Sequence, residues 1–250
     1  MSDLAAPPQP KPSLCRTDTT LSLHFSWHET QSCMDLRQPD ALNLEYTRTM
    51  MGFLLFVPEP ANIAMVGLGG GSLTKFCHRH LTTTRIQVIE INPHVIALRD
   101  EFQVPPDDKR LSVLLGDGAE FVRSRPEHFD VLMVDGYDDN GLPASLSSQR
   151  FYNDCREMLT PDGILVVNLH CGHKHWQRQA ERIRRSFNGS IVVVSDDDGS
   201  NTIVFASQKQ LFALPYAGPS RSARGSGKKA WAALRGTFSR VLAATQVDVA

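Results

Sequence analysis

Short apolar runs alternate with longer amphipathic segments from residue 62 to residue 205, and this alternation restricts the fold more than any other feature. The runs fall at residues 63–66, 86–89, 111–115, 131–134, 164–167, 191–194 and 202–205. Strands that are apolar on both faces, separated by helix-like segments, are typical of a parallel sheet covered on both sides. Only seven residues separate the last two runs, so we expect an antiparallel hairpin there. The pattern predicts a mostly parallel, Rossmann-like α/β sheet.

The two ends of the chain lack this alternation. Residues 1–18 are rich in Pro and Ala and predict a disordered leader. Residues 19–60 predict a small β-hairpin followed by a helix, from a period of two that changes to helical spacing. Residues 61–210 hold the α/β domain. Residues 211–250 predict a basic flexible tail; contact of this tail with RNA or a protein partner is the alternative.

Composition excludes several classes of protein. The 250 residues carry a formal net charge of −1, which gives no bias toward nucleic acid or acidic membranes. No apolar run is long enough to span a bilayer, and four prolines interrupt the region where a signal peptide would lie. The five cysteines are scattered and contain no C-x-x-C pair. They predict free thiols in a cytoplasmic protein rather than a disulfide framework or a zinc site.

The first apolar run leads directly into a glycine-rich loop and then into a helical pattern. The loop reads Gly67-Leu68-Gly69-Gly70-Gly71-Ser72. Glycines such as Gly67, Gly69 and Gly71 let the backbone turn tightly and approach a ligand near the free N–H groups of the helix. The dinucleotide fingerprint G-x-G-x-x-G fits badly, because Ser72 takes the place of its third glycine.

Two acidic residues at the next strand ends point to a nucleoside. Glu90 ends the second run, about twenty residues beyond the glycine loop, where a carboxylate can accept hydrogen bonds from both ribose hydroxyls. Asp117 lies between Gly116 and Gly118 after the third run and could accept from an adenine amino group. A plain turn would use the same residues, so Asp117 alone does not decide between these readings.

Three carboxylates follow the fourth run: Asp135, Asp138 and Asp139. Acids crowded at the mouth of a sheet repel one another, which suggests a functional use. They suit the binding of a cationic amine and the removal of its proton. A loop of solvated acids is the alternative.

Residues 170–175 contain three histidines and a cysteine just past the fifth run. Such a set could bind zinc or copper, but no second cluster complements it elsewhere in the sequence. We therefore expect no metal and interpret the segment as a polar loop beside the substrate.

The four strand ends, in this order, resemble the spermidine synthases, a family of polyamine aminopropyltransferases. The likeness extends from about residue 21 to residue 205 and is that of a divergent bacterial member. It implies a class I methyltransferase-type sheet with an antiparallel last strand, and transfer of an aminopropyl group from decarboxylated S-adenosylmethionine to an amine. It also implies a small-molecule amine acceptor and a possible homodimer. From the charge and the apolar runs we expect no membrane or nucleic-acid partner.

The resemblance divides the site into two halves. In the nucleoside half, Glu90 would hold the ribose, and Asp117 with Gly118 would meet the adenine. In the amine half, Asp135 would be the base and Asp138 would anchor the amine. Gln31 and Tyr46 occupy positions like those of a glutamine and a tyrosine of the family, the tyrosine near the substrate amine.

The chain departs from the family mostly in the amine half. Gly70 occupies the place of an acid that meets the donor's aminopropyl end, Asn168 replaces a glutamine, and residues 196–201 replace a tyrosine–proline–serine–glycine turn. The change at Gly70 keeps intact S-adenosylmethionine open as the donor. Two alternatives follow: an S-adenosylmethionine-dependent methyltransferase on the same fold, or a catalytically idle nucleoside-binding protein.

Overall fold

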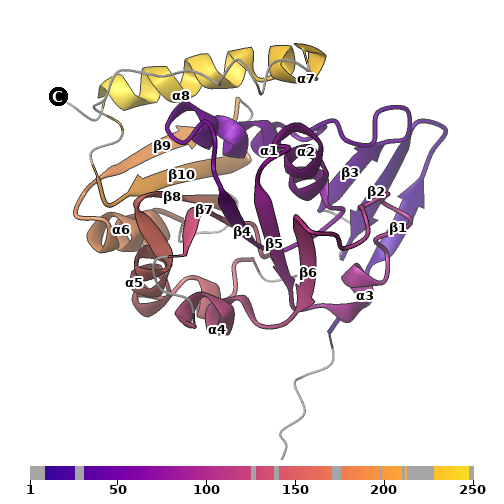
Figure 1. The fold of residues 1–250 in the computed structure, drawn as a ribbon, viewed down its shortest axis with the longest axis horizontal. Coiled ribbons are helices and arrows are strands. Elements are labelled where there is room, and N and C mark those ends of the chain that lie inside the picture. Colours follow the sequence, from indigo (N-terminus) through magenta and orange to yellow (C-terminus); the bar gives the residue numbers. More distant parts are fainter. Residues whose placement is uncertain are drawn as a thin grey trace, which may run out of the picture.

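Seven strands form one sheet in the computed structural model of the chain (Figure 1). The structure describes residues 9–25, 31–124, 128–137, 141–170, 176–197, 199–209, 212 and 228–247. In chain order the strands are β4 (Asn62–Val66), β5 (Arg85–Glu90), β6 (Leu111–Leu115), β7 (Phe129–Val134), β8 (Leu159–His170), β9 (Ile191–Ser195) and β10 (Asn201–Ser207). Each contains one of the seven apolar runs, so the predicted strands are confirmed.

The strand order is β6-β5-β4-β7-β8-β10-β9. The pairs among β6, β5, β4, β7 and β8 are parallel, whereas β10 pairs antiparallel with both β8 and β9. The last strand therefore lies inside the sheet, and its direction is the reversed one, as predicted. Because the chain passes from β5 and β6 on one side of β4 to β7 on the other, the strand ends around β4 form the cleft in which such sheets bind ligands.

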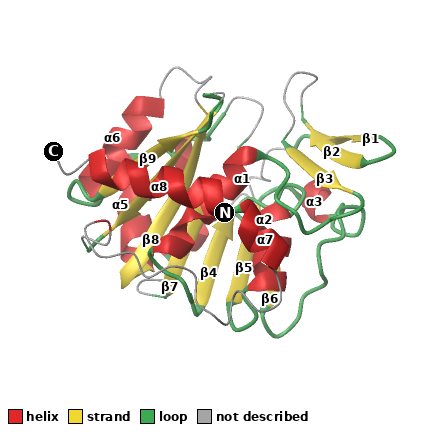
Figure 2. Ribbon diagram, turned by 90° about the horizontal axis from the view of Figure 1, so that it is seen from above, coloured by secondary structure: helices red, strands yellow, loops and turns green. Residues whose placement is uncertain are grey.

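Helices cover both faces of this sheet (Figures 1 and 2). They are α1 (Glu45–Met50), α2 (Ser72–His80), α3 (Pro93–Ile96), α4 (Gly118–Arg123), α5 (Gln149–Met158), α6 (Trp176–Ser186), α7 (Lys228–Ala233) and α8 (Arg235–Val247), with the 3₁₀ turns η1 (Met51–Leu55) and η2 (Ala144–Leu146). Successive residues of β7 face opposite sides of the sheet. Met133 packs with α1, η1 and α2, and Leu132 packs with α4, α5 and α6.

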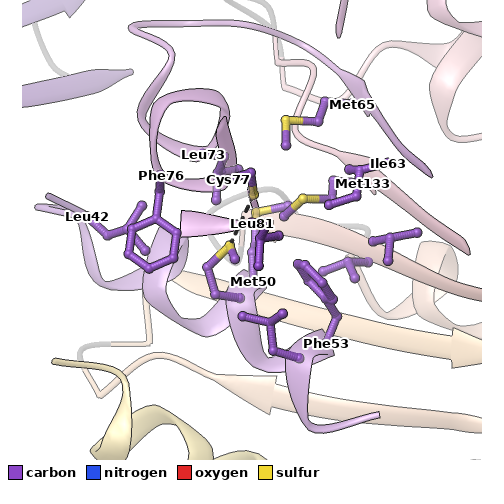
Figure 3. Close-up of a cluster of buried hydrophobic side chains, with 14 of the residues drawn as sticks. Leu42, Met50, Phe53, Ile63, Met65, Leu73, Phe76, Cys77, Leu81 and Met133 are labelled. Atoms are coloured by element: carbon purple, nitrogen blue, oxygen red, sulfur yellow. Dashed lines mark hydrogen bonds between the residues drawn. The ribbon is translucent and has the colours of Figure 1, made fainter. Parts of the chain in front are cut away.

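The core beneath α2 is rich in sulfur-containing side chains (Figure 3). Met50, Met65, Cys77 and Met133 are at most 2% exposed there, beside the ring of Phe53. Flexible thioethers fill an irregular space between a helix and a sheet well. The thiol of Cys77 is buried, and burial raises its pKa, so it serves as a small apolar group.

A three-stranded antiparallel sheet precedes the main one. It contains β1 (Ser13–Arg16), β2 (Thr20–His24) and β3 (Ser32–Asp35), and the predicted hairpin of β2 with β3 is confirmed. Strand β1 differs from the expectation of a disordered leader over residues 1–18. All four of its side chains are exposed, so it leaves no apolar pattern in the sequence and depends on backbone pairing with β2.

Helices α7 and α8 differ from the expected flexible tail in the same way. Trp231, Leu234, Phe238 and Val241 are at most 8% exposed and belong to the core on the α1–α2 side of the sheet. Their spacing puts them on one helical face, but small and polar residues fill the rest, so the apolar pattern is weak. None of the described helices combines the length and apolar character that crossing a bilayer requires.

The packing of α7 and α8 predicts that residues 228–247 stabilise the whole domain. Leu234 is fully buried, and Leu234→Ala should lower the free energy of unfolding by about 2–5 kcal/mol, the range for a buried leucine. Urea denaturation would measure this loss. Ala232→Ser, at an exposed position of α7 two residues before Leu234, is the control. Equal stability of the two variants would show that the helix does not pack on the core.

Candidate active site

A pocket opens at the carboxyl ends of the central strands. Its walls come from β2, residues 31–32, α1 and the loops that follow β4, β5, β6 and β7. Most of the predicted site residues line it: Gln31, Tyr46, Gly67, Gly69, Glu90, Asp117, Gly118 and Asp135. Gly71 is not among the described residues that line the pocket; it packs against Val104. Asp138 and Asp139 lie outside the described residues.

Glu90, at the end of β5, is a buried carboxylate that connects two loops. One of its oxygens, Oε2, accepts the backbone N–H of Leu68 at 2.8 Å, and Oε1 accepts that of Asn92 at 2.8 Å. Burial raises the pKa of this carboxyl, while the backbone N–H groups around it lower the pKa. The backbone N–H groups of Ile91 and Gly69 also lower this pKa. The carboxylate belongs to a residue that lines the pocket, and its two oxygens offer several acceptor sites, so it can also accept hydrogen bonds from a ligand.

Asp117 caps the N-terminus of α4. Its Oδ1 accepts the backbone N–H groups of Ala119 at 2.7 Å and Glu120 at 3.1 Å. Both bonds use one carboxylate oxygen, and the residue also lines the pocket. The two readings of Asp117, a turn residue and a ligand contact, are therefore compatible.

Two of the predicted glycines are required by packing alone. Gly67 has a φ of 97°, and a Cβ there would lie 2.3 Å from the carbonyl oxygen of Asp135. A Cβ on Gly118 would lie 2.4 Å from a methyl group of Val66. The close approach of these loops keeps the ends of β4, β6 and β7 near one another.

Asp135, which follows β7, is held by two side-chain donors. Its Oδ1 accepts the amide Nδ2 of Asn168 at 2.9 Å, and it also accepts a hydrogen bond from the hydroxyl of Tyr46. Burial raises the pKa of Asp135, and these two bonds oppose the rise. The hydroxyl of Tyr46 has a pKa raised well above its usual value by burial and by Asp135, so it remains a donor.

Asn168 and Tyr137 are contacts that the predicted residue set omitted. Asn168 lies in β8, beside β7, and its position just past the 164–167 run was the available signal. The hydroxyl of Tyr137 donates to the backbone carbonyl of Asn168 at 2.7 Å and accepts the N–H of His170 at 2.6 Å. This pair of bonds fixes the backbone that carries Asn168.

Gly70 has no room for a larger side chain. A Cβ there would lie 2.8 Å from the ring of Phe102 and 2.9 Å from the Cβ of Ser32. The N–H of Gly70 donates to the hydroxyl of Ser32 at 2.8 Å. Ser32 and Phe102 therefore occupy the space beside the loop, and an acid at position 70 would require both to move.

Residues before β1 also reach the pocket. Gln9 and Pro10 line it, and the amide of Asn92 donates to the carbonyl oxygen of Pro10 at 2.8 Å. The expected disordered leader thus includes two residues that line the pocket.

Asp196 lies behind the amine half, in the turn between β9 and β10. It is 6% exposed and accepts a hydrogen bond from the hydroxyl of Thr49 in α1 at 3.3 Å. Burial, and next the nearby carboxylate of Glu45, raise the pKa of Asp196 to about 6. Arg240 of α8 pairs with both Glu45 and Asp197, so three elements meet beside the helix that carries Tyr46.

No group of three or more histidine, cysteine, aspartate or glutamate side chains suited to a metal ion occurs within the described residues. Residues 171–175, which contain most of the candidate metal ligands noted in the sequence, lie outside them.

Comparison with known proteins identifies the family. The spermine/spermidine synthase domain model matches residues 43–192. A polyamine aminopropyltransferase of Neisseria meningitidis serogroup A is 38% identical over 189 residues, 75% of this chain and 72% of that protein. The corresponding protein of Chromobacterium violaceum is 36% identical over 186 residues, 74% of this chain and 71% of that protein. The chain belongs to the spermine/spermidine synthase family. It is a transferase of the aminopropyltransferase type, acting in polyamine biosynthesis, and the resemblance found in the sequence is confirmed.

Solved structures share the fold at lower identity. A probable spermidine synthase of Corynebacterium glutamicum superimposes with a TM-score of 0.70 at 19% identity, covering 87% of this chain and 82% of that one. Human methyltransferase-like protein 13, in complex with SAH, gives a TM-score of 0.61 at 22% identity, covering 80% and 93%. The predicted class I methyltransferase-type sheet is therefore confirmed.

The raised pKa of Asp196 predicts a pH-dependent difference in stability between this aminopropyltransferase and its Asp196→Asn variant. The folded chain holds the Asp196 proton more tightly than the unfolded chain does, so wild-type stability should fall as pH rises from about 4 to about 6. The asparagine does not titrate and does not contribute to this fall. Across that window, the free energy of unfolding of the variant should therefore increase by roughly 2–3 kcal/mol relative to that of the wild type. Denaturant unfolding at several pH values would measure this change. A constant difference would contradict the assignment.

Proposed function

We propose that this aminopropyltransferase takes its aminopropyl group from decarboxylated S-adenosylmethionine and that Asp135 accepts the proton of the amine acceptor. The observation that carries the proposal is the carboxylate of Asp135. It lies in the same pocket as Glu90 and Asp117, and Tyr46 and Asn168 hold it from two sides. A nucleoside half and a base are thus adjacent in one pocket.

The nucleoside half is assigned to two carboxylates on neighbouring strands. Glu90 accepts the ribose hydroxyls with the lone pairs that its backbone bonds leave free. Asp117 accepts a hydrogen bond from the adenine amino group with the oxygen that does not cap α4. Gly118 has no side chain, so the adenine ring can approach the backbone there. Glu90 has little freedom to move, because two backbone N–H groups already fix its oxygens. A fixed acceptor holds a ligand at little further entropic cost.

The difficult reactant is the acceptor. An amine with a pKa near 10 is almost fully protonated at neutral pH, and only the neutral amine can attack carbon. Asp135 first attracts the cation and then takes one proton from its nitrogen. The nitrogen then forms a bond to the aminopropyl carbon that is bonded to sulfur. The carbon–sulfur bond breaks at the same time, and its electrons leave with sulfur as neutral methylthioadenosine. Alignment of the two reactants supplies much of the rate.

The raised pKa of Asp135 suits this role. A base is most effective when its pKa is near the working pH, and burial moves this carboxyl in that direction. Tyr46 and Asn168 donate hydrogen bonds to this carboxylate. These bonds limit the rise of its pKa and fix the orientation of the carboxylate. Gln31 lines the pocket and is assigned to the acceptor, as is Asp138.

A methyltransferase is the second candidate. Gly70 favours it, because no acid at that place selects the decarboxylated donor, and Phe102 and Ser32 leave no room for one. A mouse eEF1A lysine and N-terminal methyltransferase is also 32% identical over 127 residues, 47% of this chain and 18% of that protein. Calorimetric titration separates the two: tight binding of decarboxylated S-adenosylmethionine alone supports aminopropyl transfer, and tight binding of the carboxylated form supports methyl transfer.

Replacement of Glu90 by Gln should weaken nucleoside binding. A lost charged acceptor costs about 1.5–3 kcal/mol, which corresponds to a roughly ten- to hundredfold lower affinity for methylthioadenosine. Calorimetry measures the affinity, and a melting curve reports any loss from the backbone bonds of Glu90. Glu101→Gln, at an exposed position, is the control. A lower melting temperature with unchanged affinity would give Glu90 a purely structural role.

Replacement of Asp135 by Asn should separate chemistry from binding. The variant should lose about two to four powers of ten in turnover, as expected for a missing general base. Its affinity for methylthioadenosine should stay within about threefold of the wild type, because Asp135 is assigned to the acceptor. The measurement is a turnover assay over several amines, with the exposed Asp162→Asn as control. Near-full turnover of Asp135→Asn with every accepted amine would remove this residue as the base.

A further inference from the structure

A second groove lies apart from the active-site pocket, between α7, the end of α2 and the segment before α1. Helix α7 lies beside α2 in Figure 2. It shares no lining residue with the first pocket among the described parts of the chain. Its α7 wall lies beyond residues 43–192, the region that matches the family. The groove therefore belongs in part to a segment that the family comparison does not cover.

Cationic side chains from four segments converge on this groove: Arg37, Arg48, Arg79 and Lys229. Asp40 is the one carboxylate among the described residues that line it, and it pairs with Arg79 at 3.1 Å. Arg48 donates to the backbone carbonyls of Leu42 and Asn43 at 2.7 and 2.9 Å. A basic residue in the last turn of α2 complements the helix dipole, which accounts for Arg79. The two carbonyls account for Arg48, but neither explanation applies to Arg37 or Lys229.

One residue that lines the same groove has a buried polar atom. His80 is 8% exposed, and its Nδ1 is buried without a hydrogen-bond partner in the described structure. Buried polar atoms in folded proteins nearly always have a partner, so an exception calls for an explanation. Burial, and next the charge of Arg79, lower the pKa of His80. The neutral ring can place a hydrogen on Nδ1 and donate it to a ligand oxygen.

Apart from Gln38, the rest of the lining is apolar. The ring of Phe76 contacts that of His80 in a tilted arrangement with centroids 4.6 Å apart, and Leu42, Ala233 and Leu234 are among the other apolar residues of the wall. A purely inorganic anion would use the cationic rim and leave this wall bare. A ligand with an anionic end and an apolar body would cover both.

We propose that this groove binds a small organic phosphate. The phosphate lies among the cationic groups of Arg37, Arg79 and Lys229. A guanidinium group binds two phosphate oxygens at once, and a group of several cations favours a doubly charged phosphate over a singly charged carboxylate ligand. His80 donates to a phosphate oxygen, and the organic body lies against Phe76 and Ala233. The proposal is independent of the reaction assigned to the first pocket.

Phenyl phosphate is a suitable probe, because it has the required charge and body but no nucleoside. Calorimetry on the full chain saturated with methylthioadenosine should show one further site for it. The double variant Arg37→Gln/Arg79→Gln should weaken this binding by about tenfold or more, the effect of losing two charge-assisted contacts. Arg150→Gln, an exposed arginine on α5, should bind as the wild type does. Thermal melting establishes that each variant is folded.

Two further measurements make the test specific. Inorganic phosphate should bind at least about tenfold more weakly than phenyl phosphate, since it buries no apolar surface. The ¹⁵N resonance of His80 Nδ1 should shift on titration of wild type with phenyl phosphate. Unchanged affinity in the double variant, equal affinity for the two probes, or a silent His80 resonance would each overturn the proposal. A failed turnover assay at Asp135 would leave it untouched.

Discussion

The buried carboxylate of Glu90 is the constraint on which the nucleoside half depends. A carboxylate at this depth is costly unless its charge is compensated, and here backbone N–H groups from the loops after β4 and β5 compensate it, those of Leu68 and Asn92 at 2.8 Å. Those bonds fix the glycine loop against the end of the neighbouring strand. Glu90 also lines the pocket, so the interaction that holds the loops together also fixes the residue that we propose as the acceptor for a ribose.

The amine half is built differently, from contacts between distant segments. Tyr46 comes from α1, Asp135 from the end of β7 and Asn168 from β8, and hydrogen bonds between side chains join the three residues. Helix α1 is in turn held by Thr49 and Glu45, which contact Asp196 and Arg240. Any movement of the β9–β10 turn or of α8 therefore reaches the tyrosine that donates to the proposed base.

Much of this architecture could be predicted because burial on two faces leaves a strong pattern. The runs at 63–66 and 131–134 are apolar at every position, so their strands and the site at their ends followed from sequence alone. Strand β1 and helix α8 could not be predicted in the same way. The side chains of β1 are exposed, and α8 depends on a few residues whose partners lie far away in the chain. Asn168 and Ser32 were omitted for a related reason: a polar side chain shows its role only when its partner is in place.

The ion pair between Glu45 and Arg240 joins residues 195 positions apart. During synthesis on the ribosome, the segment that contains Tyr46 emerges long before the helix that secures it. The central strands can pair as they appear, because their contacts are with nearer segments. Helix α1 must then wait with part of its apolar surface uncovered until α8 is made. In the interval before α8 is made, the segment that carries Tyr46 lacks the ion pair of Glu45 with Arg240 and is held by fewer contacts than in the finished chain.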